Sequence, residues 1–539
     1  MDSLFNEFVN LRVPEISPEP GTQPQIIDED HKCGLEIVNA IAFNFDMFDN
    51  DQQLLLKPLL QRPVTATSFV TPGGFFRVHY DPTGPNAPGY DLNLLAEALD
   101  STYKFEIDFL GYDTPPGDSA TNPNIPSEEY GGDNRYDVYI GNLGSGLYGF
   151  TKFEYEVEEG SNRFSSYMMI DNDFVNYFSP GISGAQVTVA HEFYHSIQGG
   201  NYIFRSEDTF FYEITSTAME EFVFDDVNDY YAYIPSYFNN PETPLPLTTG
   251  YNTATWNIFL RDNFDYDIIK RQWELMPSLR AMIAINNSIF EYGSSFTREF
   301  NKYGIWMYFT NYRAVPGKYF EEGVNYPLVV PTSVVQFTPP SQILNMSGKA
   351  ASHTFITFVI QGNNDSLVTI VSNGDVQNAV SGLNNFFDFN YTLYSDSSSG
   401  DRFLTENYSS MFRAGNPALW SVSEILNNLL VREDDASFSP PEGSTFAFPN
   451  PFTYGNGIIE NINFSFNGRN GEKVDFAVYS TSMNLVYSSE HFVGPLTNNS
   501  LGLKWDVRGN DGEKLASGVY IYVIQKSDEI TKGKVVIFN

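Results

Sequence analysis

The chain has 539 residues, and its 42% hydrophobic and 16% aromatic content can build several sizeable cores, so length suggests about three or four domains. Its 30 basic and 67 acidic residues give a net charge of −37, which disfavours nucleic acid and anionic membrane surfaces as partners and suits an extracellular protein. No apolar run reaches about 18 residues, and we therefore expect no transmembrane segment.

The first block, residues 1–68, is proline-rich and acidic at its start and weakly helical over residues 34–60. We expect it to be a pro-segment or a support for the domain that follows. Its start, Met1 to Glu7, lacks the basic and apolar regions of a signal peptide, so the protein is either cytoplasmic or a processed form. The C-terminal region favours the processed form. Cys33 is the only cysteine, which excludes an intrachain disulfide.

Residues 69–320 alternate predicted strands and helices. Alternating apolar side chains predict strands over residues 136–140 and 167–170. Residues 186–198 read as a helix, which contains the HExxH motif His191-Glu192-Phe193-Tyr194-His195. With 6 His and 67 acidic residues in 539, random placement gives this pattern with an expectation below about 0.01. On a helix, both imidazoles can reach one Zn²⁺ ion, and Glu192 lies beside the open coordination position.

A third ligand is expected, because a catalytic zinc ion usually takes three protein ligands and keeps one position for water. No His follows until His353, whereas residues 210–221 read as a second helix and Glu213 lies 18 positions after His195. Glu213 is therefore the candidate third ligand. Glu220 and Glu221 are the rival ligands, but we expect both on a solvated acidic face of the helix.

The HExxH motif followed by Glu213 resembles the gluzincin clan of metallopeptidases. The resemblance is closest to a poorly characterised family of secreted bacterial metallopeptidases, whose HEFxHxIQ motif matches residues 191–198 and whose glutamate-opened helix matches residues 213–221. The chain departs from this pattern at Ile214, where such helices more often carry Gly. Residues 76–80, 131–140 and 166–173 look like the strand segments of that family.

This resemblance implies a zincin-like α+β domain that holds one Zn²⁺ through His191, His195 and Glu213. Glu192 would be the base that takes a proton from the attacking water. In gluzincin-like folds an edge strand near the zinc helix pairs with extended substrate, which is a form of β-augmentation.

Residues 251–260 begin another predicted helix, which resembles the helix that carries a tyrosine over the zinc in gluzincin aminopeptidases. A phenol O–H can stabilise the oxyanion that develops at the scissile carbonyl. Tyr251 is our candidate for this role, and Tyr292 in Glu291-Tyr292-Gly293 is the alternative.

Residues 321–438 become β-rich, with a predicted strand over residues 354–360, and residues 434–444 read as a linker. Residues 439–539 are a predicted all-β module that opens with Pro449-Asn450-Pro451-Phe452. In it, Asn510-Asp511-Gly512 predicts a turn and residues 518–523 an alternating strand. The module resembles the Ig-like domain of flagellar hook-capping proteins and of type IX secretion sorting domains. This resemblance implies a secreted or cell-surface protein with the secretion machinery as a partner.

Two further sets of residues are candidate ligands. Cys33, in His31-Lys32-Cys33-Gly34, could occupy the open zinc position as a thiolate, as in cysteine-switch propeptides, but we favour a small buried core residue. The clusters Asp171-Asn172-Asp173 and Asp225-Asp226-Val227-Asn228-Asp229 could bind Ca²⁺, although neither fits EF-hand spacing.

The sequence thus predicts an α+β zincin-like catalytic domain followed by all-β modules, the last an Ig-like sandwich. The predicted function is that of a secreted zinc endopeptidase acting on protein or peptide substrates. One alternative is a surface adhesin with a non-proteolytic zinc site, against which the intact Glu192 argues. The other is an aminopeptidase, which needs a carboxylate-rich clamp such as G-x-M-E-N that we do not identify.

Overall fold

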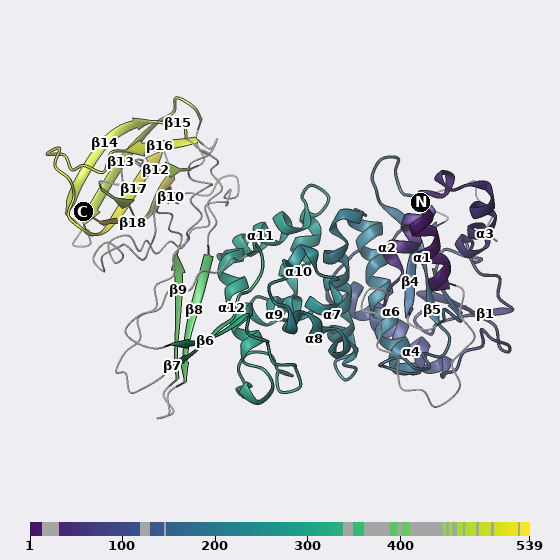
Figure 1. The fold of residues 1–539 in the computed structure, drawn as a ribbon. Helices are drawn as coiled ribbons and strands as arrows, with labels where there is room; N and C mark the ends of the chain where they lie inside the picture. The colour runs from purple at the N-terminus through teal and green to yellow at the C-terminus, as the bar shows by residue number, and fades with distance from the viewer. Residues whose placement is uncertain are drawn as a thin grey trace. The chain divides into compact units, whose positions relative to one another are not determined.

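The computed structural model describes fourteen segments of the chain (Figure 1). They are residues 1–12, 32–118, 130–144, 147–337, 349–360, 389–396, 402–409, 446–448, 452–454, 461–466, 469–480, 484–496, 501–526 and 529–538. The predicted linker at residues 434–444 and the opening Pro449-Asn450-Pro451 of the last module lie outside these segments. Within them, no helix combines the length and the apolar character needed to cross a membrane.

The chain forms two compact units. The first includes Met1–Ser288 and Tyr303–Phe337 and holds a mixed sheet with helices around it. The second includes Ile360–Asn539 and holds the largely antiparallel sheets of the C-terminal region. The fold class is therefore mixed α/β in the N-terminal region and β in the C-terminal region.

A five-stranded mixed sheet organises the first unit, in the order β1-β2-β3-β5-β4. Strands β2, β3 and β5 are parallel, and the two outer strands run antiparallel to their neighbours. The strands predicted over residues 136–140 and 167–170 are confirmed, whereas β4 was not predicted. The strands are β1 (Thr67–Val70), β2 (Phe76–Tyr80), β3 (Tyr136–Gly141), β4 (Gly149–Glu156) and β5 (Phe164–Asp171).

Strands β3 and β5 are buried on both faces, as expected for inner parallel strands. On one face, Tyr167 and Met169 pack in a cluster with residues of the three N-terminal helices. Because side chains alternate along a strand, their neighbours point to the opposite face. There Phe76 packs against Phe193 of the HExxH helix with ring centroids 5.0 Å apart. The N-terminal helices are α1 (Asp2–Arg12), α2 (Leu35–Phe43) and α3 (Asn50–Leu60).

The two predicted site helices are confirmed as α6 (Ile182–Ile197) and α7 (Thr209–Val223). Helix α6 packs on β4, β5, α4 (Leu92–Tyr103) and α7. The predicted helix from Tyr251 is divided into a short turn, η8 (Tyr251–Thr253), and α9 (Thr255–Asn263). The other helical segments are η1 (Phe45–Met47), η2 (Lys104–Phe109), η4 (Gln198–Tyr202), η5 (Ser206–Asp208), η6 (Asp229–Ala232), α8 (Ile234–Asn239), η7 (Leu245–Leu247), α10 (Tyr266–Leu275), α11 (Ala281–Glu291), α12 (Phe296–Tyr308) and η9 (Asn311–Arg313).

Two small sheets follow, formed by β6 (Ser333–Phe337) with β7 (Ile356–Ile360) and by β8 (Phe389–Asp396) with β9 (Arg402–Ser409). Strand β7 confirms the strand predicted over residues 354–360.

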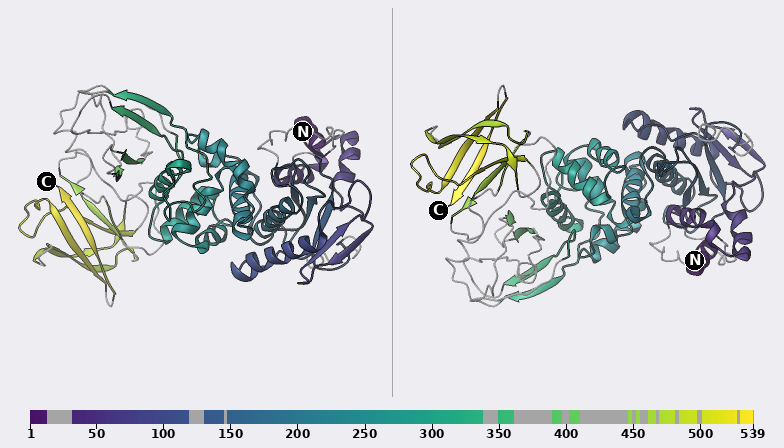
Figure 2. Two further views of the ribbon diagram at one scale, coloured as in Figure 1. Left: turned by 90° about the horizontal axis from the view of Figure 1, so that it is seen from below. Right: turned by 90° about the horizontal axis from the view of Figure 1, so that it is seen from above.

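The C-terminal region contains a four-stranded sheet, β10-β12-β16-β15, and a five-stranded sheet, β11-β18-β17-β13-β14, both drawn in yellow and green in Figure 2. Residues of both sheets meet in one apolar cluster, where the rings of Phe464 and Phe476 lie 4.7 Å apart. The predicted strand at residues 518–523 is part of β17, and Gly512 in the predicted turn has φ +79°. The strands are β10 (Phe446–Phe448), β11 (Phe452–Thr453), β12 (Ile462–Ser465), β13 (Lys473–Ser480), β14 (Leu485–Phe492), β15 (Gly494–Pro495), β16 (Leu501–Trp505), β17 (Gly518–Lys526) and β18 (Glu529–Phe538).

Candidate metal centre

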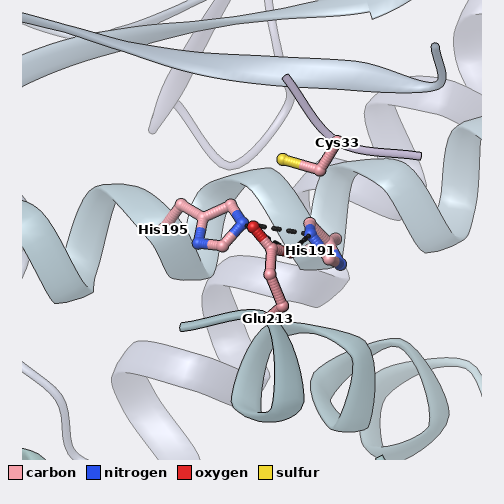
Figure 3. Close-up of side chains that lie close together, drawn as sticks. All are labelled: Cys33, His191, His195 and Glu213. Carbon is pink, nitrogen blue, oxygen red and sulfur yellow. Dashed lines mark hydrogen bonds and ion pairs between the residues drawn. The ribbon is translucent and has the colours of Figure 1, made fainter. Parts of the chain in front are cut away.

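Helix α6 presents His191 and His195 on the same face, because residues four apart lie about one turn apart. Both side chains are buried, with exposed fractions of 1% and 0%. Their Nε2 atoms lie 3.0 Å apart. Glu213 reaches the same point from α7, and its Oε2 lies 3.0 Å from Nε2 of His191 and 3.5 Å from Nε2 of His195 (Figure 3). The structure therefore brings the three predicted ligands together.

Hydrogen bonds on the far side of each ring determine which nitrogen carries the proton. Nδ1 of His191 lies 2.7 Å from Oε1 of Glu220 and must donate, since a carboxylate only accepts. Nδ1 of His195 lies 2.7 Å from Oε1 of Gln198. The amide nitrogen of Gln198 donates to Thr215 and to a backbone carbonyl, which fixes the orientation of the amide. In the neutral rings, both Nε2 atoms therefore carry the lone pairs, and these point toward Glu213.

Three acceptor atoms converge in this way, two from imidazoles and one from a carboxylate. Such a set is repulsive by itself and becomes favourable when a cation lies between its members. Two His and one carboxylate are a common zinc-binding set, and outer hydrogen bonds of this kind orient metal-bound imidazoles. The residues thus fit a metal ion.

In the metal-free protein a proton can take the place of the cation. Burial lowers the pKa of His191, but its hydrogen bonds to Glu213 and Glu220 outweigh this and raise the pKa to about 9. For Glu213, burial raises the pKa, but the two imidazoles outweigh burial and lower the pKa to about 2. Metal binding at this site must therefore release a proton.

Cys33 also lies in this cluster. One ligand atom each from Cys33, His191, His195 and Glu213 all lie within 4.8 Å of one another. Cys33 is buried, as the preferred prediction expects, but it lies among the candidate metal ligands rather than apart from them. Its Sγ accepts a hydrogen bond from the backbone of Leu35 at 3.3 Å. Burial and nearby carboxylates raise the pKa of this thiol, and a bound cation would act in the opposite direction.

Lys32 ties the same segment to the protein interior and was not singled out from the sequence. Its side chain is 1% exposed, and Nζ lies 2.6 Å from both Glu220 Oε2 and Asp229 Oδ2. Two tyrosine rings flank this ammonium group at 4.9 and 5.1 Å. Burial lowers the pKa of Lys32, but the two carboxylates raise it above its usual value. Since Glu220 also accepts from His191, Lys32 and the imidazole share one carboxylate.

Glu192 is buried beside the cluster with an exposed fraction of 1%. The hydroxyl of Thr151 on β4 lies 2.8 Å from Oε2 of Glu192 and 2.7 Å from its backbone oxygen, which holds the residue in place. Burial raises the pKa of Glu192, and the two imidazoles and hydrogen bonds to Thr151 and Cys33 offset this only in part. Glu192 thus provides a carboxyl group that is not one of the clustered ligand atoms.

Tyr251 lies close to the cluster, and its hydroxyl accepts a hydrogen bond from the backbone N–H of Cys33 at 3.3 Å. Gly250 allows this position, because its φ is +94° and a Cβ there would lie 2.4 Å from Cβ of Glu213. Burial, with the charge of Glu213, raises the pKa of Tyr251 well above its usual value. The alternative, Tyr292, belongs to the second compact unit and is 40% exposed.

The prediction that Glu220 and Glu221 lie on a solvated face is wrong, because their exposed fractions are 0% and 3%. Helix α7 is packed on several sides, so its polar residues face protein instead of water. Glu220 accepts hydrogen bonds from His191 and from Lys32. Burial and the nearby acids Glu322 and Asp225 raise the pKa of Glu221 to about 9, which favours its protonated form at neutral pH.

The acidic clusters considered for Ca²⁺ have other partners. The carboxylate of Asp171 accepts hydrogen bonds from three backbone N–H groups, and that of Asp229 pairs with Lys32 and with the Tyr148 hydroxyl. Neither cluster is among the groups of described residues whose side chains lie close enough together to hold a metal.

No model of a known protein family and no curated protein matches this chain. Among solved structures, 18% of the chain is similar to 12% of PorZ, an essential bacterial surface component of the type-IX secretion system of Porphyromonas gingivalis, with 20% identity and a TM-score of 0.14. A further match relates 28% of the chain to 12% of dimeric latent PorU from Porphyromonas gingivalis, with 19% identity and a TM-score of 0.14. At these TM-scores neither similarity assigns a fold to the chain.

Proposed function

We propose that the chain is a zinc-dependent endopeptidase of gluzincin type, with the metal held by His191, His195 and Glu213. The observation that carries this proposal is the convergence of their three lone-pair atoms beside a buried, non-ligating Glu192. When bound, zinc would polarise a scissile carbonyl and lower the pKa of the attacking water.

Glu192 would take a proton from that water and later pass it to the leaving amine. Its raised pKa supports this role, because a base works best when its pKa approaches the working pH. The hydroxyl of Thr151, 2.8 Å from Oε2, would orient the carboxylate.

Tyr251 would donate its O–H to the oxyanion that develops at the carbonyl. Its raised pKa supports this role, because the phenol keeps its proton at neutral pH. An extended substrate would pair with the edge strand β4. Gly149, at the start of this strand, lies close to Glu192, because a Cβ there would lie 3.1 Å from Cγ of Glu192. This closeness supports a substrate position on β4 beside the proposed base.

A second function has its own support. Four buried protein ligands are typical of structural zinc sites, whereas catalytic sites keep one position open. In this alternative the metal would only stabilise the first unit of a surface binding protein. The buried Glu192, which metal binding does not require, favours the peptidase.

We also propose that residues 439–539 form an Ig-like sandwich that directs the protein to the cell surface or outside the cell. The shared apolar core of the two C-terminal sheets supports the sandwich. The role in export rests on the sequence resemblance alone. If a protein that lacks residues 439–539 still leaves the cell of its native host, the sorting role is excluded.

The peptidase is tested by hydrolysis of casein with the zinc-loaded chain, both intact and as Cys33→Ala, which frees the position near the thiol. We expect at least one of the two chains to hydrolyse casein. Glu192→Gln in that chain should abolish hydrolysis without changing the zinc content. Two zinc-loaded chains that both leave casein intact would contradict the proposal.

A further inference from the structure

Residues 32–34, here called the strap, lie along the outer edge of β4, which is the last strand of the sheet. The backbone N–H of Gly34 donates to the carbonyl of Gly149, and that of Tyr148 donates to the carbonyl of Lys32, both at 2.9 Å. Cys33 and Gly149 form a parallel bridge. Gly34 permits this approach, because a Cβ there would lie 3.0 Å from Cβ of Phe150. The strap therefore uses the main-chain groups that an added peptide strand would need.

The side chain of Asn39 on α2 continues this pairing along β4. Its amide donates to the carbonyl of Thr151 at 2.9 Å and accepts from the N–H of Phe153 at 2.8 Å. One side-chain amide thus replaces the peptide group of a neighbouring strand. The hydrogen-bonding groups of the edge from Tyr148 to Phe153 are therefore largely satisfied by the chain itself.

The strap also contacts the side chains that the proposed reaction would use. The Cys33 thiol lies among the three candidate metal ligands, and the Cys33 N–H donates to the hydroxyl oxygen of Tyr251. Figure 3 shows Cys33 on one side of the imidazoles and Glu213 on the other. Three consecutive residues thus contact the candidate metal position, the hydroxyl oxygen of Tyr251 and the peptide-binding edge of β4.

Lys32 anchors the strap. Its ammonium group lies between the carboxylates of Glu220 and Asp229, all three buried. Removal of one partner from a buried ion pair leaves an uncompensated charge, which is strongly unfavourable. The strap can therefore leave only if Glu220 and Asp229 are solvated at the same time.

We propose that the strap is a built-in inhibitor that holds the peptidase latent, with the Cys33 thiolate in the coordination position that the attacking water needs. This inference rests on the proposed function. With a metal bound, the Cys33 thiol would release its proton to solvent, and its sulfur would hold the metal together with His191, His195 and Glu213. An internal ligand acts at an effective concentration on the order of millimolar or more, so external ligands compete poorly. Activation requires the Cys33 sulfur to leave the metal.

The test compares the zinc-loaded full chain with Cys33→Ala and Cys33→Ser. X-ray absorption at the zinc edge should find one sulfur at about 2.3 Å in the intact chain and none in either variant. A peptide hydroxamate, which chelates zinc at the open position, should bind both variants at least about 100-fold more tightly than the intact chain. Casein hydrolysis should rise by a similar factor, and Glu192→Gln in the Cys33→Ala chain should abolish it.

The outcomes separate latency from the peptidase itself. Zinc without a sulfur neighbour, or equal hydroxamate binding by intact and variant chains, would overturn the inhibitor while leaving an active intact chain a peptidase. Loss of zinc from both Cys33 variants would overturn it as well, since Cys33 would then be a structural ligand. Variants that gain hydroxamate binding but never hydrolyse casein would support the occupied position and contradict the proposed function.

Discussion

The apolar core of the C-terminal sheets and the surroundings of α6 are both buried, but they are made of different residues. Around Phe464, Phe476 and Trp505 the cluster is built of apolar and aromatic residues. Around α6, charged residues such as Lys32 and Glu220 are buried to the same extent. Apolar burial stabilises a fold by itself, whereas buried charges are tolerated only with partners. The difference fits the proposal that the polar groups near α6 serve a metal centre.

The largest expected effect tests the apolar side of this comparison. Phe476→Ala removes a fully buried ring that contacts Phe464 and Trp505, and should lower the free energy of unfolding of the C-terminal region by about 3–5 kcal/mol. Denaturant unfolding measures it, with the exposed Ser488→Ala as control. The zinc content should stay the same, and its loss would show that the two regions are not independent.

The next effect concerns the oxyanion. In the Cys33→Ala chain, Tyr251→Phe should lower kcat by about 10- to 1000-fold with a smaller change in KM, because the O–H acts mainly in the transition state. Tyr292→Phe is the matched control and should leave turnover unchanged. Steady-state kinetics on a peptide substrate decides this. A reduced rate in the control but not in Tyr251→Phe would move the role to Tyr292.

A smaller effect is expected from the outer hydrogen bond of His191. Glu220→Gln should weaken zinc binding by about 10- to 100-fold, because the amide orients the imidazole less well than the carboxylate. Glu221→Gln, one position further along α7, should leave zinc affinity unchanged. Competition with a chelator compares the two, and equal affinities would mean that Glu220 does not support the metal site.

The smallest effect concerns stability and pH. Burial and nearby acids raise the pKa of Glu221 to about 9 in the folded protein, whereas the unfolded chain releases this proton near pH 4.5. Stability from this group is thus complete below pH 4.5 and is lost as the pH rises toward 9. Glu221→Gln should therefore stabilise the protein more at pH 8 than at pH 5, because the amide never has to be held neutral against its ordinary pKa. A stability gain that is the same at both pH values would contradict the assignment.

The sequence predicted the parts of the site that depend on local spacing. His191 and His195 follow from helical periodicity, and Glu213 from the position of the next helix. Glu220 was misplaced because a helix packed on several sides has no solvated face, and the pattern of α7 does not reveal its neighbours. Cys33 and Lys32 could not be placed, since their contacts lie more than a hundred positions away. Strand β4 was missed, although Phe150, Phe153 and Tyr155 give it an aromatic character.

The fold likewise has features that follow from local sequence and features that depend on long-range contacts. The strands of the C-terminal module follow from alternation and turn residues such as Gly512, which are local signals. The order β1-β2-β3-β5-β4 depends on long-range pairing, and so does the covering of the β4 edge by the strap. These features decide whether the site is open, and none of them has a signature within a short window of sequence.

The central claim is that His191, His195 and Glu213 hold one metal ion, and native mass spectrometry of the purified chain tests it most directly. The parent and Glu192→Gln should each carry one zinc per chain that is lost on denaturation. Glu213→Ala, prepared at the same zinc concentration, should carry almost none, while Glu221→Gln should match the parent. Full zinc occupancy in Glu213→Ala, or no metal in the parent after zinc loading, would contradict the account.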